Sequence, residues 1–420
     1  MRKFFSENPF LKYFFTGVTT FCIGFLVATY VPAYSKIVTI VNSSVPFTAT
    51  DKHDLDDLPT QNLGEAYRAI KENYYGFSTL QKDTIVEGMI KGMMESLKDK
   101  HSLYFDPSET QEFNQTIKGN FEGIGAYVGK TQSGVLVRTT FEGSPAKLAD
   151  IQDGDIITLV NKESVLDLDL ETAVRKIRGP SGTEVELQIA RPSENWKSYT
   201  KKVVRRSVKV PSVVSKITDE KIGVITVGIF GESTPNEFLQ AYMNLTGSGM
   251  KGLVIDLRDN PGGLLSSATS LLQNFIPEGQ LLVETKSNTQ ELQQKYFSEG
   301  PGGVTLPIVV LINENSASAS EIFAGAIQDY NRGIVIGTKS YGKGSVQITY
   351  PLRNDGELKI TVAKWYTPKE RGIDGTGILP DIESKIQNED YENKYDRVLD
   401  EGTKTLKKLI GGTQVLDIKK

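Results

Sequence analysis

The sequence predicts an α/β core that carries a small inserted β module, preceded by a helical region and an apolar N-terminal segment. Three observations support this fold class. From about Lys201 onward, strand-like and helix-like segments alternate, which is typical of an α/β core. Residues 113–195 contain short β-rich pieces separated by glycines. Residues 13–31 form a mostly apolar run without a charge, and this length suits one helical membrane span.

The apolar segment, residues 13–33, is predicted to be one transmembrane helix. Arg2, Lys3 and Lys12 precede it, so the positive-inside rule places residues 1–12 in the cytoplasm. A cleaved signal peptide and a buried soluble helix are the alternatives, but the run is long for a signal peptide and no clean small-residue cleavage site follows. We therefore expect a single-pass protein of the cytoplasmic membrane whose folded part is extracytoplasmic, either periplasmic or at the cell surface.

Composition excludes several classes of function. The 48 Lys and Arg residues nearly balance the 52 Asp and Glu residues of the 420-residue chain, which disfavours a nucleic-acid partner. The single cysteine, Cys22, excludes an internal disulfide and a cysteine-cluster metal site. The two histidines are His53, in a polar linker, and His101, which stands alone. No metal site is therefore expected, and a Ser-His-Asp arrangement is disfavoured.

Each remaining segment has its own pattern. Residues 34–60, rich in Ser, Thr, Asp and Pro, are predicted to be a linker. Residues 61–112 show apolar side chains at helical spacing, and the methionines on this pattern, Met89, Met93 and Met94, are interpreted as core.

Residues 113–195 are predicted to hold the strands GIGAYV, GVLVRTTF, DIITLV and TEVELQIA and a helix at 170–177. In the predicted core, residues 196–388, strands are expected at 222–230, 252–257, 307–312 and in GIVIGT. Helices are expected near Thr234, near Leu264 and in ASEIFAGAIQDY. Residues 389–420 are predicted to form a C-terminal helix and tail.

One candidate for chemistry is Ser318, at the junction between a buried strand that ends at Ile312 and a helix that begins near Ala319. A serine there lies beside the free backbone N–H groups and the positive end of the helix, where a developing oxyanion can be stabilised. The alternative is purely structural, because Ser318 and Glu321 match a capping box. On this segment alone, capping is the simpler interpretation.

The second candidate is Lys343, which lies between Gly342 and Gly344 ahead of a β-like run. The glycines can bring the backbone close to another element, and burial disfavours the charged form of a lysine. A neutral lysine can take a proton from a serine hydroxyl, and the Gln347 amide, four residues on, can orient the amine. The alternative is a turn with an exposed lysine and an ordinary strand glutamine.

Two glycine-rich turns complete the candidates. The DNPGG turn, residues 259–263, follows a buried strand and can aim the Gly262 and Gly263 amides into a site. The loop around Ile124 can form a nest of amides for a carboxylate, and the next strand offers an edge for an added peptide strand. A connecting turn and a glycine-rich strand edge are the respective alternatives.

Together these segments resemble the carboxy-terminal (tail-specific) processing peptidases, a family of serine peptidases with a Ser–Lys dyad and a PDZ module. The resemblance runs from about Asn62 to Glu383. It is carried by LRDNPGG, NSASASEIFAGAIQDY, GTKSYGKGSVQ and DGTGILPDIE, and in the PDZ-like part by GIGAYV, GSPAKLADIQDGDIITLVN and IRGPSGTEVEL. Two residues depart from the family's pattern: Asp259 stands where an Asn is common, and Asp150 where a Gly is often found.

The resemblance implies a ClpP/crotonase-like α/β protease core with an inserted PDZ-like β domain. It also implies a role for each candidate residue. Ser318 would be the nucleophile, Lys343 the base and Gln347 the residue that positions the lysine. The resemblance further implies an oxyanion hole from Gly263 and Ala319, a supporting or capping role for Glu321, and binding of the substrate's C-terminal carboxylate by Ile124, Gly125 and Ala126.

The expected function is that of a membrane-anchored serine endopeptidase that binds an exposed apolar C-terminus through its PDZ domain and cleaves the same polypeptide. The resemblance implies no metal and no cofactor, protein or peptide substrates, and a homo-oligomer or an adaptor as possible partners. Two alternatives stay open. One is a non-catalytic PDZ scaffold that binds protein C-termini, and the other is a crotonase-like acyl-group enzyme, which the membrane segment and the β module disfavour.

Overall fold

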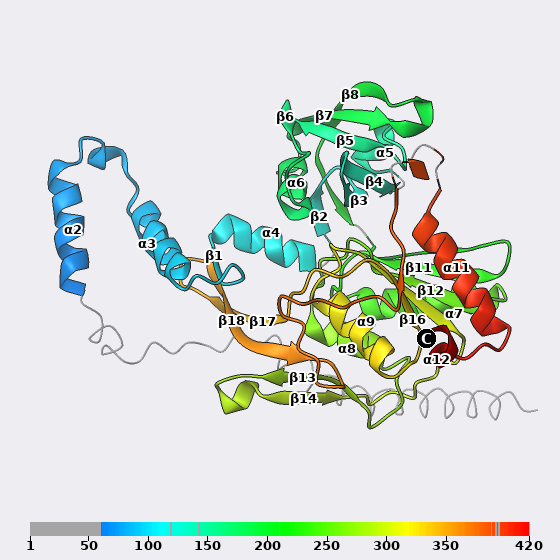
Figure 1. Cartoon of the computed structure of the whole chain (residues 1–420). Coiled ribbons are helices and arrows are strands. Elements are labelled where there is room, and N and C mark those ends of the chain that lie inside the picture. The colour runs from blue at the N-terminus through cyan, green and yellow to red at the C-terminus, as the bar shows by residue number, and fades with distance from the viewer. Residues whose placement is uncertain are drawn as a thin grey trace, which may run out of the picture. The chain divides into compact units, whose positions relative to one another are not determined.

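The computed structural model describes residues 60–117, 120–141, 143–209, 211–387, 389–390, 393 and 395–419 (Figure 1). The chain divides into two compact units, Met1–Ala69 and Ile70–Lys420. The predicted transmembrane segment, residues 13–33, lies outside the described residues. Within the described ranges, no helix combines the length and the apolar character that crossing a membrane requires.

The central sheet of the second unit runs in the order β10-β11-β12-β15-β16-β19. In this sheet β11, β12, β15, β16 and β19 run parallel to one another, and β10 pairs antiparallel with β11 at the edge. The strands are β10 (Val213–Ile217), β11 (Ile222–Val227), β12 (Gly252–Asp256), β15 (Ile308–Ile312), β16 (Ile334–Gly337) and β19 (Ile382–Glu383).

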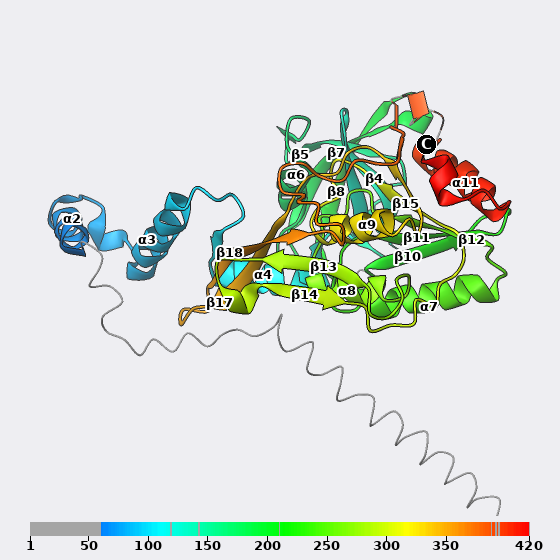
Figure 2. The same ribbon diagram turned by 60° about the horizontal axis from the view of Figure 1, so that its bottom comes forward.

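Helices cover both faces of this sheet, so its inner strands are buried on both sides. On β15, Ile308, Val310 and Ile312 pack in one core with α7, α8 and α9, whereas Val309 and Leu311 pack in a second core with α11. Burial on both faces explains why the strand is an uninterrupted apolar run. Figure 2 shows α7 and α11 on opposite sides of β11 and β12. The helices are α7 (Thr234–Gly247), α8 (Leu265–Leu272), α9 (Ala319–Asp329), α11 (Arg397–Ile410) and the short α12 (Val415–Ile418).

A second sheet crosses the unit and joins segments that are far apart in the sequence. Its order is β1-β18-β13-β14, and β17 pairs with β18. The long β17–β18 hairpin follows Lys343 directly, and β1 adds a strand from the N-terminal region to its edge. The strands are β1 (Leu103–Phe105), β13 (Leu281–Lys286), β14 (Gln294–Phe297), β17 (Ser345–Pro351) and β18 (Glu357–Tyr366).

The inserted module is a separate antiparallel sheet with its own core. The order is β3-β4-β5-β7-β8, so β3 is an outer strand, and β6 pairs with β5. A short ladder, β2 (Asn120–Gly123) with β9 (Arg206–Lys209), joins the two ends of the module. The other elements are β3 (Ala126–Thr131), β4 (Gly134–Thr140), α5 (Pro145–Leu148), β5 (Ile156–Val160), β6 (Glu163–Ser164), α6 (Leu170–Ile177), β7 (Glu184–Arg191) and β8 (Lys197–Val204).

The N-terminal region is helical, as the sequence predicts, and the interpretation of its methionines as core is confirmed for Met94 but wrong for Met89 and Met93. The helices are α2 (Thr60–Asn73), α3 (Lys82–Ser96) and α4 (Pro107–Ile117). Met89 and Met93 are 36% and 60% exposed, and only Met94 of α3 is buried. Apolar residues at helical spacing predict the helix and its face, but not what covers that face.

Candidate active site

Ser318 lies in the connection between β15 and α9, at the N-cap of a helix in which every residue except Gln328 is buried. Its backbone has φ 53°, which is rare for a residue other than glycine. Such a conformation costs free energy and persists only where the surroundings enforce it, most often at functional sites. The residue is half-buried, between buried Ala317 and buried Ala319. The small neighbours leave the serine accessible at the end of the central sheet.

Glu321 organises the backbone around this serine. Its side chain is fully buried, and Oε2 accepts the N–H of Ser318 at 2.7 Å and the N–H of Lys343 at 2.9 Å. Oε1 accepts the N–H of Gly342 at 2.7 Å and the hydroxyl of Ser340 at 2.6 Å. Burial raises the pKa of Glu321, and these four donors oppose that rise because they favour the ionised form. The capping role is thus real, and the same carboxylate joins both candidate segments.

Lys343 is held in place by its backbone. Its carbonyl oxygen accepts the indole N–H of buried Trp365 at 3.0 Å, and the side chain is half-buried. The flanking glycines lie against residues 374–377. A Cβ on Gly342 would lie 3.0 Å from the nitrogen of Gly377, and one on Gly344 would collide with Asp374. The expectation that these glycines permit close approach to another element is therefore confirmed.

The DNPGG turn packs its backbone directly against Ser318. Asn260, fully buried, donates from Nδ2 to the Val227 carbonyl and accepts the Gly262 N–H at Oδ1, both at 2.8 Å. Gly262 has φ 100°, and a Cβ there would lie 2.8 Å from the Ser318 Cβ and 3.0 Å from the Ala319 nitrogen. Only glycine fits this position, because the backbone of the turn packs directly against the start of α9. The turn and the start of α9 therefore form one continuous surface.

The two amides expected to form an oxyanion hole lie on this surface. Gly263 pairs with Phe230 in an isolated parallel β-bridge, and the Phe230 carbonyl accepts the N–H of Leu264 at 2.7 Å. Among the hydrogen bonds between described residues, none uses the N–H of Gly263 or of Ala319. Both donors can therefore serve a bound oxygen beside Ser318.

Gln347 lies on β17 and donates its side-chain amide to two hydroxyl groups. Nε2 contacts the Ser345 Oγ at 2.8 Å and the Thr361 Oγ1 at 3.2 Å. Lys343 precedes Ser345, the first residue of β17, by two positions, and Gln347 follows Ser345 by two positions. Alternate residues of an extended segment lie on one face. The amide oxygen of Gln347 remains as the acceptor on this side chain.

Asp259, one of the two residues that depart from the family's pattern, is buried, and both of its carboxylate oxygens have partners. Its carboxylate forms an ion pair with Arg138 of β4 and accepts the side-chain amides of Asn313 and Asn315, each at 2.8 Å. Burial alone would raise the pKa of Asp259, but Arg138 and the two amides lower it overall. An ion pair between a buried carboxylate and a partly exposed guanidinium therefore joins the turn beside Ser318 to the inserted module.

The predicted carboxylate-binding loop has the required backbone direction. The carbonyls of Ile124 and Gly125 accept the N–H groups of Ala146 and Phe141, at 2.8 and 3.2 Å. Because a trans peptide directs N–H and C=O to opposite sides, the Gly125 and Ala126 amides point away from these partners. Gly125 has φ 73°, as a nest of amides requires.

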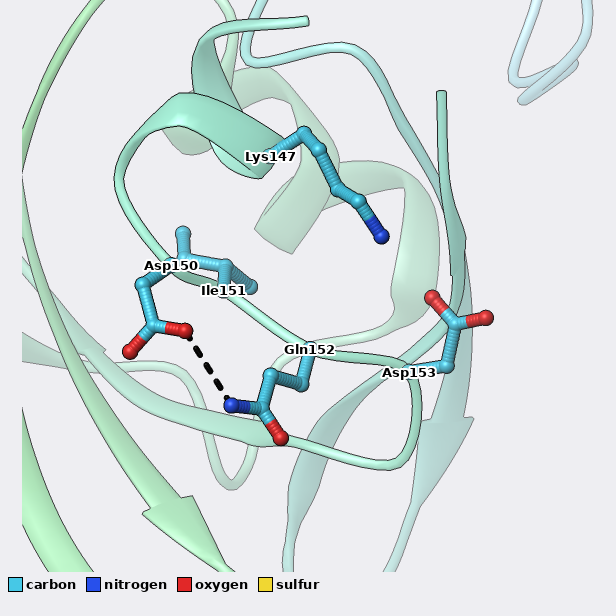
Figure 3. Close-up of a pocket in the computed structure, with 5 residues that line it drawn as sticks. All are labelled: Lys147, Asp150, Ile151, Gln152 and Asp153. Carbon is cyan, nitrogen blue, oxygen red and sulfur yellow. Dashed lines mark hydrogen bonds between the residues drawn. The ribbon is translucent and has the colours of Figure 1, made fainter. Parts of the chain in front are cut away.

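A pocket in the inserted module is unrelated to these candidates. It is lined by Lys147, Asp150, Ile151, Gln152 and Asp153, and Figure 3 shows the Asp150 carboxylate accepting the Gln152 amide, at 3.1 Å. Asp150 has φ 56°, a conformation that aspartate tolerates better than most residues. The turn thus keeps its shape with an aspartate at the position where a glycine is common.

Sequence reasoning missed Asn260 and Arg138. Asn260 had a signal, because it is a polar residue directly after a buried strand at the sheet edge where sites form. Arg138 had none, because its partner Asp259 is 121 positions away in the sequence.

Comparison with known proteins agrees with this architecture. Residues 221–384 match peptidase family S41, residues 141–191 match a PDZ domain, and residues 32–110 match the N-terminal domain of the activating protease CtpB. The carboxy-terminal processing protease CtpA of Bacillus subtilis (strain 168) is 34% identical over 378 residues, which cover 90% of this chain and 78% of that protein. A probable CtpA-like serine protease of Staphylococcus aureus (strain COL) is 35% identical, covering 86% and 71%.

Solved structures show the same fold. The photosystem II D1 C-terminal processing protease has a TM-score of 0.52 and 25% identity, covering 78% of this chain and 93% of that one. Mature CPAF, at 16% identity, has a TM-score of 0.51 and covers 84% and 98%.

These findings define a serine-type peptidase with a PDZ domain and N-terminal helices. The chain belongs to peptidase family S41, among the carboxy-terminal processing peptidases.

Proposed function

We propose that the chain is a membrane-anchored endopeptidase that binds the C-terminus of a protein substrate through its PDZ domain and cleaves by a Ser318–Lys343 dyad. The Lys343 amine takes the proton of the Ser318 hydroxyl as Oγ attacks the scissile carbonyl carbon. The oxyanion accepts the Gly263 and Ala319 amides. The lysyl ammonium then protonates the leaving amine, and water hydrolyses the acyl-enzyme to release the second product and restore Ser318.

The observation that carries this proposal is the carboxylate shared by the two segments. Oε2 of Glu321 accepts both the Ser318 N–H and the Lys343 N–H. The distance between these two backbone nitrogens therefore cannot exceed the sum of the two hydrogen-bond lengths. Two segments that are far apart in the sequence are thereby fixed side by side. Since catalysis depends on positioning, a buried carboxylate that holds both backbones supports a nucleophile and base pair.

The PDZ domain is proposed to read the substrate's carboxylate and to present the chain to the dyad. The outer strand β3 can accept an added peptide strand, with its C-terminus at the Gly125 and Ala126 amides. On the same strand, a Cβ at Gly129 would collide with the Asp259 carboxylate. The proposed peptide-binding strand therefore adjoins the turn beside Ser318, which supports coupling between binding and cleavage.

We also propose that residues 13–33 anchor the protein in the cytoplasmic membrane, with the peptidase outside the cytoplasm. The uncharged run and the basic residues before it support this topology. Alkaline carbonate extraction of membranes, followed by protease treatment of intact cells without their wall, tests it. Release by carbonate, or protection of the peptidase in such cells, would contradict the proposal.

The activity test uses the full chain in detergent and an unfolded protein that ends in an apolar tag, Val-Ala-Val. Cleavage followed by mass spectrometry should disappear with Ser318→Ala and weaken when the tag is amidated. Ser316→Ala, in the same junction, is the matched control for nonspecific disturbance of the turn. Cleavage that survives Ser318→Ala would refute the nucleophile, and tag binding without cleavage by any form would favour a scaffold.

A further inference from the structure

The DNPGG turn carries a buried carboxylate close to the proposed nucleophile. Asp259 begins the turn and directly precedes Asn260, whose carbonyl accepts the N–H of Ala317 at 3.0 Å. Ala317 in turn directly precedes Ser318. Asp259 and Ser318 are therefore connected through two peptide bonds and one hydrogen bond.

The Asp259 side chain contacts the same junction a second time. Oδ1 accepts the side-chain amides of Asn313 and Asn315, each at 2.8 Å, and both residues lie in the connection that leads to Ser318. Burial raises the pKa of Asp259, but Arg138 and then the two amides lower it overall, so the carboxylate is ionised at neutral pH. The amides are neutral, and the cation that pairs with Asp259 among the described residues is Arg138.

Arg138 reaches this carboxylate from the PDZ domain because its strand, β4, is irregular. The register of β4 with β3 shifts between Tyr127 and Val128, and Arg138 is the residue that the shift leaves without a cross-strand partner. Such bulges commonly redirect a side chain beside an active site. Both Nε and Nη2 of Arg138 contact Oδ2 of Asp259. Gly129 of β3 leaves room for the pair, since a Cβ there would collide with the carboxylate.

A carboxylate charge that no cation cancels would oppose the proposed reaction in two ways. It would repel the oxyanion that forms at the neighbouring junction. It would also favour the ammonium form of Lys343, which cannot take the Ser318 proton. Two unit charges roughly 10 Å apart at an effective dielectric of about 20 change such an equilibrium on the order of tenfold. The pairing of Asp259 therefore affects the rate as well as the stability.

We propose that Arg138 of the PDZ domain cancels the Asp259 charge beside the oxyanion hole, so that the oxyanion and the neutral Lys343 amine both form readily. The inference rests on the proposed Ser318–Lys343 mechanism. Arg138 and Asp259 touch no reacting atom, and Arg138 is a positioning residue that acts through Asp259. The charge balance of the active site is thus completed by a side chain of another domain.

The other charged groups around Asp259 and Lys343 stay in place in the variants that test this. On the side of the turn, Asp396 forms an ion pair with Arg258 and also interacts electrostatically with Arg138. On the side of the lysine lie Glu321, which accepts its N–H, His101, and Asp374, which pairs with Lys364. Because Asp396 also interacts with Arg138, a variant of Asp259 is needed beside the variant of Arg138.

The test measures kcat and KM against pH for the full chain in detergent, with the Val-Ala-Val-tagged unfolded protein as substrate. Arg138→Gln keeps an amide donor but loses the charge. It should lower kcat at neutral pH about tenfold and move the rising limb of the kcat profile about one pH unit upward, with little change in KM. Arg138→Lys keeps the charge and should retain the profile of the unmodified protein. Arg206→Gln, at an exposed arginine of β9, is the matched control.

Asp259→Asn provides the opposite perturbation. Its side-chain oxygen can still accept an amide, but the uncancelled charge is now that of Arg138, so the limb should move downward. The double variant Arg138→Gln with Asp259→Asn should return kcat and the limb close to their original values. This rescue separates a charge effect from a packing effect, which would leave the limb in place.

A limb that stays in place in Asp259→Asn, or that moves in the same direction in both single variants, would overturn the inference. Additive losses in the double variant would also overturn it. Asp259→Asn decides alone if Arg138→Gln does not fold. If Ser318→Ala or Lys343→Ala retains cleavage, the underlying mechanism fails instead, and the two failures are thereby distinguished.

Discussion

The backbone N–H groups of Ser318 and Lys343 donate to the same carboxylate oxygen, at 2.7 and 2.9 Å. The oxygen belongs to buried Glu321, which caps the helix behind Ser318. One carboxylate therefore both caps the helix and aligns the two segments. From the sequence alone, helix capping and catalysis are alternative interpretations of this motif, and the geometry makes them compatible.

Lys343→Arg should strongly lower kcat although it keeps a long cationic side chain. A guanidinium is not deprotonated near neutral pH, so it cannot accept the Ser318 proton. We expect a loss of about 10²–10⁴ in kcat, the range that general acid–base catalysis contributes. Steady-state kinetics on the tagged substrate measures it. Lys339→Arg, exposed in the same loop, should cleave like the unmodified protein, and an active Lys343→Arg enzyme would exclude lysine as the base.

Glu321→Gln should destabilise the protein and lower its activity together. A glutamine keeps one acceptor oxygen, which serves two of the four donors, and turns an NH₂ group toward the other two, so buried donors lose their partner. Each unsatisfied buried donor costs about 1–3 kcal/mol. Urea unfolding measures the loss. Glu314→Gln, an exposed residue of the same junction with one hydrogen bond to Thr338, is the control, and equal midpoints for the two variants would contradict the role of Glu321.

Arg138→Ala should reverse the contribution of Asp259 to the pH dependence of the free energy of unfolding. In the intact protein the folded-state pKa of Asp259 lies below its ordinary value of 3.8, so its stabilisation is present above that pH and is lost as the pH falls through the lower pKa. Without Arg138, burial raises the pKa, and stability then falls as the pH rises through the raised value. At neutral pH the loss should be about 3–5 kcal/mol, as for other buried pairs that lose one partner.

Urea unfolding between acid and neutral pH checks this reversal. The double variant Arg138→Ala with Asp259→Asn removes the unpaired charge and should recover most of the stability. An Arg138→Ala variant whose stability still rises with pH over this range would show that another group compensates Asp259.

Local patterns were sufficient to predict much of the fold. The apolar runs of β12 and β15 predicted buried strands, and the helix over 170–177 was found at the same residues as α6. The hairpin β17–β18 was not foreseen beyond a β-like run after Lys343. Most residues of β18 are only half-buried, and the strand pairs with β1, which comes from the opposite end of the folded chain.

The candidate site likewise has one part that local motifs predict and another part that depends on the tertiary structure. Ser318, Lys343 and Glu321 lie in short motifs whose spacing can be read directly, and the structure brings these motifs together. Arg138 contributes through Asp259, 121 positions along the chain, and such a pairing exists only once the tertiary structure has formed. The roles of the site residues remain predictions, which the Ser318, Lys343 and Glu321 variants test.

His101→Gln should leave cleavage and its pH profile unchanged. Burial first, and then the charges of Lys343 and Lys100, lower the pKa of His101 below 6.5, so the ring is neutral at pH 7. Below 6.5 the unfolded chain binds this proton more readily, so stability falls as the pH drops, and that part of the dependence should vanish in the variant. His53→Gln, at the other histidine of the sequence, is the control. An activity limb near pH 6.5 that disappears only in His101→Gln would identify an imidazole base and refute the Ser–Lys mechanism.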